Sequence, residues 1–375
     1  MPHDQRRPRA GRHGVNLPPD MLANIHGRLS FLDRLAFASV FRESRDAFKP
    51  EAPWLVLPGE TTETTTLFSL ADRRAAAVPA PDPALRDHAV LGSSRGWLAT
   101  ADARGRMWLV NPVTCEQRTL PPITTIPCLE ARGGGTLFMR SHLYRKVVFS
   151  ESPGGVHHGG AAMLITGSLF GVAAFATVGE AVWRLAPSCD GVEDAIYHHG
   201  KFYSVTYSGA VEVWEHNAYT GVFTSVAVTP RLADAGGDPP FHRKYLVAAP
   251  DGRLMVVLKT VPKTDKHDSG RWTCSFKVQV LDGAQWKETD DIGEAALFVG
   301  ANESLCVSTM LHQELKAGRV YYTEDDLSRA SSWKDDGGRR GVGVFCLKDG
   351  TMEDVEGHGQ HRSWPPPAWF TPSIP

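Results

Sequence analysis

The first residues whose type and spacing suggest chemistry are residues 92–96, which match the pattern Gly-x-Ser-x-Gly. In hydrolases built from alternating strands and helices, this pattern holds a nucleophilic serine on a tight turn between a strand and a helix. Here Ser94 is followed by Trp97 and Leu98, which favour a strand, and no alternation of strands and helices surrounds the motif. The sequence therefore predicts a turn between two strands and no catalytic residue.

Two pairs of adjacent histidines are candidate metal ligands: His157 with His158, and His198 with His199. Neighbouring residues on a strand point to opposite faces of a sheet, so neither pair is expected to converge on one metal ion. No Cys-x-x-Cys pair of a zinc site or a redox dithiol occurs among the six cysteines. They are Cys115, Cys128, Cys189, Cys274, Cys306 and Cys346. We expect buried free thiols in a reducing compartment, and neither a metal nor a cofactor.

Two acidic groups and one glycine run are further candidates for ligand binding. Residues 324–326, Glu-Asp-Asp, and the aspartates at 335–336 lack the alternating oxygen ligands and the central glycine of a calcium loop. We expect both groups to be surface charge. The glycines at 133–135 are not followed by the lysine and hydroxyl residue of a phosphate-binding loop, so they predict a flexible connector.

The overall charge and composition exclude several classes of protein. The 375 residues carry 40 basic and 42 acidic side chains, a formal net charge of -2, so bulk attraction to nucleic acid is not expected. With 42% hydrophobic and 22% charged residues, the chain is typical of a globular protein. Residues 1–16 are basic and lack the apolar core of a secretory signal, so they predict a disordered arm.

Residues 161–178 are uncharged and long enough to span a bilayer. However, Gly167, Ser168 and Gly171 divide the segment into two short runs, and the charged and aromatic anchors that flank a span are missing. The segment therefore predicts a hairpin of two buried strands, and we expect no membrane partner.

Residues 17–50 differ from the rest of the chain because their apolar residues recur at helical spacing. Two prolines and an aspartate at 18–20 are typical of the start of one helix, and Ser30 with Asp33 is a capping-box start for a second. A third short helix is expected over 41–48. About 30 helical residues cannot form a large core, so this segment must pack on a neighbour or a partner.

From residue 53 onward the sequence repeats a β unit, in which a turn glycine opens a strand and two further strands follow. The glycines are Gly96, Gly200, Gly252 and Gly318, the expected second strands are 107–111, 211–215, 276–282 and 342–347, and the third are 117–120, 222–226, 285–288 and 352–355. Such repeated small sheets are typical of propeller blades. About 320 residues at about 45 per blade predict six or seven blades. A β-sandwich or barrel is the alternative.

Residues 363–370, SWPPPAWF, permit two interpretations. The prolines could form a polyproline II segment that docks into an aromatic groove of another protein. Because Trp364, Trp369 and Phe370 are costly to expose to water, we favour a terminal strand or tail that packs on the propeller.

The helical segment at 17–48, LPPDMLANIHGRLSFLDRLAFASVFRESRDAF, resembles an F-box, the three-helix module that binds the Skp adaptor of cullin-based ubiquitin ligases. The resemblance implies an adaptor-binding set made of Leu17, Pro18, Leu22, Ile25, Leu29, Leu32 and Leu35. F-boxes commonly carry Cys-Arg-x-Trp in the third helix, whereas residues 41–45 here read Phe-Arg-Glu-Ser-Arg. A degenerate F-box that no longer binds the adaptor is therefore an alternative.

Residues 51–375 resemble the plant F-box proteins whose C-terminal domain is a KIB-type β-propeller. The segments that carry this resemblance are PWLVLP (53–58), FSLADRRA (68–75), GSSRGWLATAD (92–102), LVNPVT (109–114), GKFYSVTYSGAVEVW (200–214), PDGRLMVVLK (250–259), ALFVGANESLCVST (296–309) and SWPPPAWF. The implied fold class is a small all-α F-box module at 17–50 followed by a large all-β propeller.

The same resemblance implies a function. The chain would be the non-catalytic substrate receptor of an SCF-type cullin ubiquitin ligase, in the nucleus or the cytoplasm. The F-box would bind the Skp adaptor and through it cullin, and the propeller would bind a target protein that the sequence does not identify. Two alternatives remain: a stand-alone propeller that binds proteins, and an enzyme that uses the propeller funnel, for which the sequence offers no set of acid, base and metal ligands.

Overall fold

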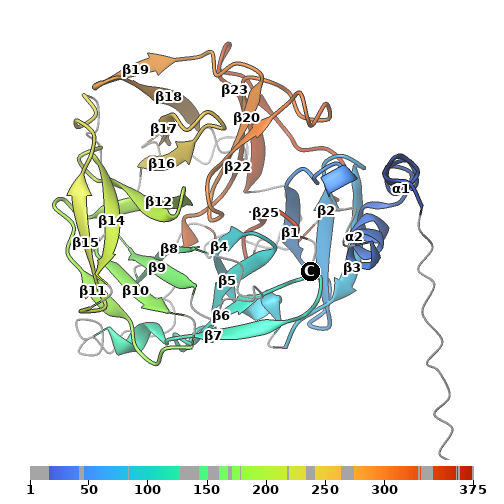
Figure 1. Cartoon of the computed structure of the whole chain (residues 1–375), viewed down its shortest axis with the longest axis horizontal. Coiled ribbons are helices and arrows are strands. Elements are labelled where there is room, and N and C mark those ends of the chain that lie inside the picture. Colours follow the sequence, from blue (N-terminus) through green and yellow to red (C-terminus); the bar gives the residue numbers. More distant parts are fainter. Residues whose placement is uncertain are drawn as a thin grey trace, which may run out of the picture. The chain divides into compact units, whose positions relative to one another are not determined.

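Figure 1 shows the computed structural model of the chain. The structure describes residues 17–41, 46–82, 84–126, 143–150, 160–167, 171–177, 179–217, 219–233, 241–262, 274–327, 330, 341–359, 361 and 364–373. The chain divides into two compact units, residues 1–50 and residues 51–373.

Several predictions concern residues outside the described ranges. They are the disordered arm at 1–16, the missing tryptophan at 42–45, the glycine run at 133–135, the pair His157 and His158, and the aspartates at 335–336. These predictions are neither confirmed nor contradicted by the structure.

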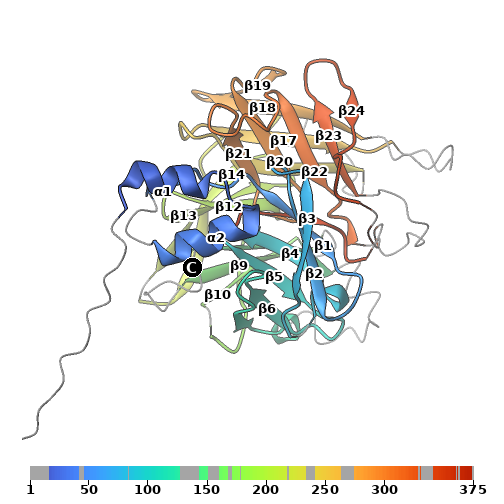
Figure 2. The same ribbon diagram turned by 90° about the vertical axis from the view of Figure 1, so that its right-hand side faces the viewer.

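The described residues of the first unit form two α-helices, α1 (Pro19–His26) and α2 (Phe31–Val40). Figure 2 shows both along their lengths. At the start of α2, the Ser30 hydroxyl donates to Asp33 Oδ2 at 2.6 Å and accepts from the Asp33 N–H at 3.4 Å. The predicted helix start is therefore confirmed, and the serine satisfies one of the N–H groups that lack a partner in the first turn.

A small apolar cluster holds this unit together. Leu22 of α1, Ala38 of α2 and Phe48 are buried against one another, and the ring of His26 stacks on Phe48 with centroids 4.5 Å apart. Where a third helix was expected over 41–48, the described residues 46–47 form a short 3₁₀ turn. After this turn, the buried side chain of Phe48 packs against the two helices.

The second unit is a β-propeller. In the part of the chain that the structure describes, its strands form six sheets, or blades, which follow one another around a central axis in Figure 1. Blade 1 contains β25 (Ala368–Phe370), β1 (Trp54–Pro58), β2 (Thr64–Ser69) and β3 (Arg74–Pro79); blade 2 contains β4 (Ala89–Ser94), β5 (Trp97–Ala101), β6 (Met107–Val110) and β7 (Gln117–Leu120). Blade 3 contains β8 (Tyr144–Phe149), β9 (Ala161–Thr166), β10 (Ala173–Thr177) and β11 (Arg184–Ala186).

The remaining blades come from the second half of the chain. Blade 4 contains β12 (Val192–His198), β13 (Lys201–Thr206), β14 (Val211–Asn217) and β15 (Val222–Ala227); blade 5 contains β16 (His242–Ala248), β17 (Leu254–Thr260), β18 (Ser275–Asp282) and β19 (Gln285–Thr289). Blade 6 contains β21 (Leu305–Ser308), β20 (Ala295–Val299), β22 (Arg319–Thr323), β23 (Val342–Cys346) and β24 (Met352–Glu353). Six is the lower of the two predicted blade numbers, because blade 6 takes a fifth strand and long connections separate several others.

The Gly-x-Ser-x-Gly motif is a hairpin turn, as predicted. Strands β4 and β5 pair up to Ser94 and Trp97, and the two residues between them, Arg95 and Gly96, both have positive φ, 49° and 84°. A two-residue turn of this kind matches the twist of the strands that it joins. A Cβ at Gly96 would lie 2.0 Å from the side chain of Ser373, so only glycine fits.

Blade 1 is built from two distant parts of the chain, and their pairing closes the ring of blades. Strand β25, near the end of the chain, pairs antiparallel with β1, near the start of the unit. Trp369 is fully buried and meets the rings of Phe298 and Tyr321 in blade 6, at centroid distances of 5.1 and 6.2 Å. The prediction of a packed terminal strand is therefore confirmed.

The apolar segment at 161–178 forms the predicted hairpin, since β9 pairs antiparallel with β10. Both strands are almost entirely buried. Across the described ranges, no helix combines the length and the apolar character that crossing a membrane requires.

Candidate functional site

The predicted adaptor-binding residues divide by exposure in the helical unit. Leu22 and Leu35 are buried, with 2% and 4% of their surfaces exposed, and Leu22 belongs to the cluster that joins the helices. These two leucines are therefore core residues in the structure and do not offer a free contact surface. Pro18 and Ile25 are exposed, and Leu17, Leu29 and Leu32 are partly buried.

Two exposed apolar residues were absent from the predicted set. Met21 is 52% exposed and Val40 is 73% exposed. Met21 lies four residues before Ile25, so the two side chains are neighbours on one face of α1. The four-residue spacing was the signal in the sequence that could have paired them.

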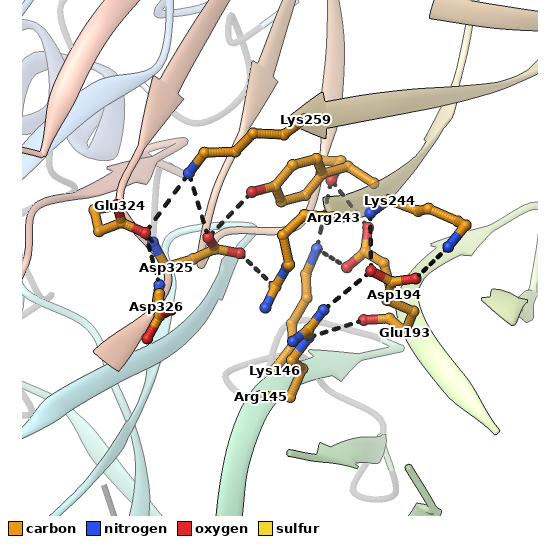
Figure 3. A network of polar contacts seen from close by, with 12 residues as sticks. Arg145, Lys146, Glu193, Asp194, Arg243, Lys244, Lys259, Glu324, Asp325 and Asp326 are labelled. Atoms are coloured by element: carbon orange, nitrogen blue, oxygen red, sulfur yellow. Dashed lines mark hydrogen bonds and ion pairs between the residues drawn. The ribbon is translucent and has the colours of Figure 1, made fainter. Parts of the chain in front are cut away.

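A second candidate site lies at the centre of the propeller. The innermost strands β25, β4, β8, β12, β16 and β21 contact one another around the axis. Three of them, in successive blades, carry charged side chains at their second and third residues: Arg145 and Lys146 in β8, Glu193 and Asp194 in β12, and Arg243 and Lys244 in β16. Each pair has the same place in its strand, and Figure 3 shows the six side chains gathered in one network of polar contacts.

These charges form ion pairs between blades. Arg145 Nη2 lies 3.2 Å from Glu193 Oε1, and Lys244 Nζ lies 2.8 Å from Glu193 Oε2. Lys146 Nζ lies 2.5 Å from Asp194 Oδ1, and the N–H of Leu246 donates to the other oxygen of Asp194. The carboxylates of β12 thus bind cations from the blades on both sides.

The acidic segment at 324–326 extends this network, so the prediction that it is surface charge is wrong. Glu324 and Asp325 are buried, with 8% and 6% of their surfaces exposed. Arg243 Nη2 donates to Asp325, the hydroxyl of Tyr245 donates to Asp325 Oδ1 at 3.1 Å, and Lys259 Nζ lies 3.6 Å from Glu324. Burial by itself would raise the pKa of Asp325, but Arg243 and Lys259 lower that pKa to about 2.

A buried segment between β20 and β21 adds further hydrogen bonds to the network at the centre of the propeller. Residues 301–304 are all buried, and they contact the inner strands of three other blades, including β8, where Lys146 Nζ donates to Ser304 Oγ at 3.4 Å. The N–H of Glu303 donates to the carbonyl of Ser93 in β4, its carboxylate accepts from the N–H of Tyr197 in β12, and Ser304 donates to Asp194 at 3.3 Å. Burial raises the pKa of Glu303 above its ordinary value, despite the hydrogen bonds that it accepts from Ser94 and Tyr197.

The other candidate ligands that the structure describes lie apart from one another, except for one histidine pair. In the described part of the chain, no group of three or more metal-binding side chains lies together. His198 and His199 do not point apart as predicted: their rings are 3.9 Å apart, because His199 has left the strand and has a φ of 46°. None of the five described cysteines forms a disulfide, and among them Cys346 is buried but Cys189 is exposed, so the prediction of uniformly buried thiols is wrong.

The family of the chain follows from comparison with known proteins. The family model described as the KIB1-4 beta-propeller matches residues 67–346, which is more than half of the chain. The chain belongs to the KIB1-4 beta-propeller family. The six blades of the structure, with the terminal strand β25 closing the ring, are therefore the fold of a KIB1-4 propeller.

One curated relative of this KIB1-4 propeller is an F-box protein. The chain is 24% identical over 198 residues to F-box protein At2g17036 of Arabidopsis thaliana, a match that covers 48% of this chain and 45% of the relative. The match thus spans less than half of the relative's length.

Solved propellers resemble the chain only distantly. The propeller domain of Cps50 (Swd1) from Myceliophteria thermophila has a TM-score of 0.33 and 12% identity, and the match covers 81% of this chain and 85% of that one. The WD40 propeller domain of Doa1 has a TM-score of 0.25 and 10% identity, with 57% and 64% covered. At TM-scores this low, the likeness carries no weight for fold or function.

Proposed function

We propose that this KIB1-4 propeller protein is the non-catalytic substrate receptor of an SCF-type ubiquitin ligase. Its helical unit would bind a Skp adaptor, and its propeller would bind the target protein. The observation that carries the proposal is an N-terminal pair of helices with an exposed apolar face, next in sequence to a propeller of this family. The match to an Arabidopsis F-box protein supports the same function.

The exposed face of α1 is apolar, so we expect the contact with the adaptor to be hydrophobic. Met21 and Ile25 are 52% and 36% exposed, although both are large and apolar, whereas Leu22 on the same helix is buried in the core. A partner that covers Met21 and Ile25 gains the free energy of removing apolar surface from water, about 25 cal/mol for each Å². We therefore assign the first contact with the adaptor to these two side chains.

The test is a pull-down of a purified plant Skp adaptor with the full chain and with the chain lacking residues 1–50. We expect the full chain alone to bind. Ile25→Asp should weaken adaptor binding at least about 100-fold, because it places an unpaired carboxylate in an apolar contact. Asn24→Asp is the matched control, since it adds the same charge to the neighbouring exposed residue of α1.

Two results would contradict this function. If the full chain does not retain the adaptor under gentle conditions, the receptor proposal fails. If Ile25→Asp and Asn24→Asp weaken binding equally, the adaptor contact is not the Met21–Ile25 face. Circular dichroism of both variants shows whether the helices are intact.

A further inference from the structure

One outer strand of the propeller differs in charge from the other five. In the part of the chain that the structure describes, the outermost strands of the six blades are β3, β7, β11, β15, β19 and β24. Strand β15, Val-Phe-Thr-Ser-Val-Ala, contains no charged residue, and it lies at the rim of the ring in Figure 1. Charged side chains on an edge strand oppose its pairing with another chain, and among these six strands only β15 lacks them. The charged residues of the other five are Arg74, Arg118, Arg184, Lys287, Glu288 and Glu353.

The outer edge of β15 carries a regular row of main-chain donors and acceptors. The strand pairs with β14 over its whole length without a shift in register, and directly after it the N–H of Val228 donates to the carbonyl of Val211 at 2.8 Å. Because successive residues of a strand direct these groups to opposite sides, the N–H and C=O of Phe223, Ser225 and Ala227 point away from β14. Within the described structure none of these outward groups makes a hydrogen bond. Such an edge is complementary to another extended backbone.

The two faces of β15 differ in exposure. On one face the ring of Phe223 stacks on Phe175 of blade 3 with centroids 3.9 Å apart, and the Ser225 hydroxyl donates to the carbonyl of Pro187 at 3.3 Å. This face is therefore packed on the neighbouring blade. The other face presents three exposed valines, Val222 at 42%, Val226 at 59% and Val228 at 49%. Exposed β-branched residues beside an open edge favour a partner strand that covers them.

We propose that two copies of this chain pair through β15, with the two strands antiparallel and a two-fold axis at Ser225. In this register Phe223 lies opposite Ala227 of the second copy, and Ser225 lies opposite Ser225 of the second copy. All the outward N–H and C=O groups then have partners, because each of these opposed pairs exchanges two hydrogen bonds. A two-fold contact of this kind uses the same surface on both subunits, so the assembly closes at the dimer.

The side chains and the absence of charge in β15 fit a second copy of the same strand. In the same register Val222 lies opposite Val228 of the second copy and Thr224 lies opposite Val226, so the exposed valines of both chains cover one another. The pairing removes no charge of β15 from water, because the strand has none. Pairing of β15 with any of the other five outer strands would place a charged side chain in the contact. The occupant that fits the edge of β15 is therefore β15 itself.

The length of the edge determines how strong the dimer should be. Six residues of strand span roughly 20 Å, and one pair of such strands buries less surface than the roughly 1,200 Å² or more of a stable protein interface. We therefore expect a weak dimer that forms at micromolar concentrations of the chain. The pairing uses no residue of the helical unit, so it does not depend on the proposed adaptor contact, and either proposal can fail without the other.

The test is sedimentation velocity of the full chain, without adaptor, at concentrations from about 1 to 200 μM. We expect the sedimentation coefficient to rise from that of a monomer to that of a dimer. Thr224→Lys should raise the dissociation constant at least about tenfold, because it places a lysine from each copy in an uncharged contact. Thr119→Lys is the matched control, since Thr119 is also an exposed threonine in an outer strand, β7. This control should dimerise like the unchanged chain.

A second variant tests whether the copies pair through the main chain. Ala227→Pro removes an outward N–H but no hydrogen bond between β14 and β15. It should weaken the dimer at least about tenfold, and full dimerisation of this variant would contradict main-chain pairing. A chain that stays monomeric at the highest concentration, or equal losses in Thr224→Lys and Thr119→Lys, would overturn the proposal. Growth beyond a dimer would do the same, because a symmetric contact leaves no second β15 free.

Discussion

Asp325 is the residue at which burial and charge oppose each other most clearly. A carboxylate that is removed from water stays ionised only if cations and donors replace the water. Arg243, Lys259 and the Tyr245 hydroxyl surround it, and they outweigh its burial, so that its pKa falls to about 2. Lys259 also lies near Glu324, so Arg243 is the cation that depends most directly on Asp325 for compensation.

We expect Asp325→Asn to lower the free energy of unfolding by about 3–5 kcal/mol, because it leaves Arg243 and Lys259 without their shared carboxylate. The comparison variant is Asp251→Asn, which removes an ion pair with Arg253 in which both side chains are more than half exposed. That change should cost less than about 1 kcal/mol, since water screens the pair. Urea unfolding of both variants measures the difference, and equal costs would mean that the network is not buried.

At the scale of the element, the three-residue strand β25 connects three blades of the propeller. It supplies the innermost strand of blade 1 from the other end of the chain, and Ser93 in β4 also donates to the carbonyl of Trp369. The strand is thus bound to β1 by the sheet ladder, to blade 2 by this hydrogen bond and to blade 6 by the ring of Trp369.

Trp369→Ala should destabilise the propeller by about 3–5 kcal/mol, because it opens a cavity between blades 1 and 6 and frees the closing strand. Tyr219→Ala provides the reference, since Tyr219 is also a large aromatic residue but is completely exposed. Its expected cost is within about 0.5 kcal/mol. Thermal unfolding separates the two; a Trp369→Ala midpoint as high as that of Tyr219→Ala would show that β25 does not close the ring.

Among the secondary-structure elements, the repeated hairpins were predicted most accurately from the sequence. All four predicted third strands and all four second strands occur within about two residues of their expected bounds, for example β7 at Gln117–Leu120. A turn glycine with positive φ followed by alternating residues is a local signal, and the hairpin is a local structure. Strand β24, Met352–Glu353, ends two residues before its expected bound, because this edge strand pairs through only two residues.

At the scale of the whole molecule, the buried ion pairs at the centre of the propeller make its stability depend on pH. The pKa of Asp325 is about 2 in the folded protein, below its ordinary value of 3.8. A group whose pKa is lowered by folding stabilises the protein above its unfolded pKa, and this stabilisation is lost as the pH falls towards the folded pKa. Protonation of Asp325 thus links the stability of the propeller to the ion pairs of Arg243 and Lys259 in blade 5.

We expect the free energy of unfolding to fall by about 2 kcal/mol between pH 4 and pH 2 through Asp325. In Asp325→Asn this contribution should be absent, so the difference in stability between the two proteins should shrink as the pH falls through this range. Urea unfolding at pH 6, 4, 3 and 2 gives the comparison. A difference that stays constant down to pH 2 would mean that Asp325 does not have a lowered pKa.

The sequence by itself determined those features of the protein that depend on local patterns. Helical spacing and the Ser30–Asp33 cap located the first unit, and turn glycines with alternating strands located the blades, because these signals depend on residues a few positions apart. The helical spacing also selected the apolar stripe of the first unit. It did not separate buried Leu22 from exposed Met21, since which side of a helix is covered depends on what packs there.

The tertiary structure alone decided the central site. Arg145, Glu193, Arg243 and Asp325 are about 50 to 180 residues apart in the chain, and each appears on its own as an ordinary surface charge. Closure of the ring brings the inner strands of successive blades together and removes these side chains from water, so each charge must pair with a charge from another blade. Only the closed ring determines which cation meets which carboxylate, because no spacing within a single blade specifies its neighbour across the axis.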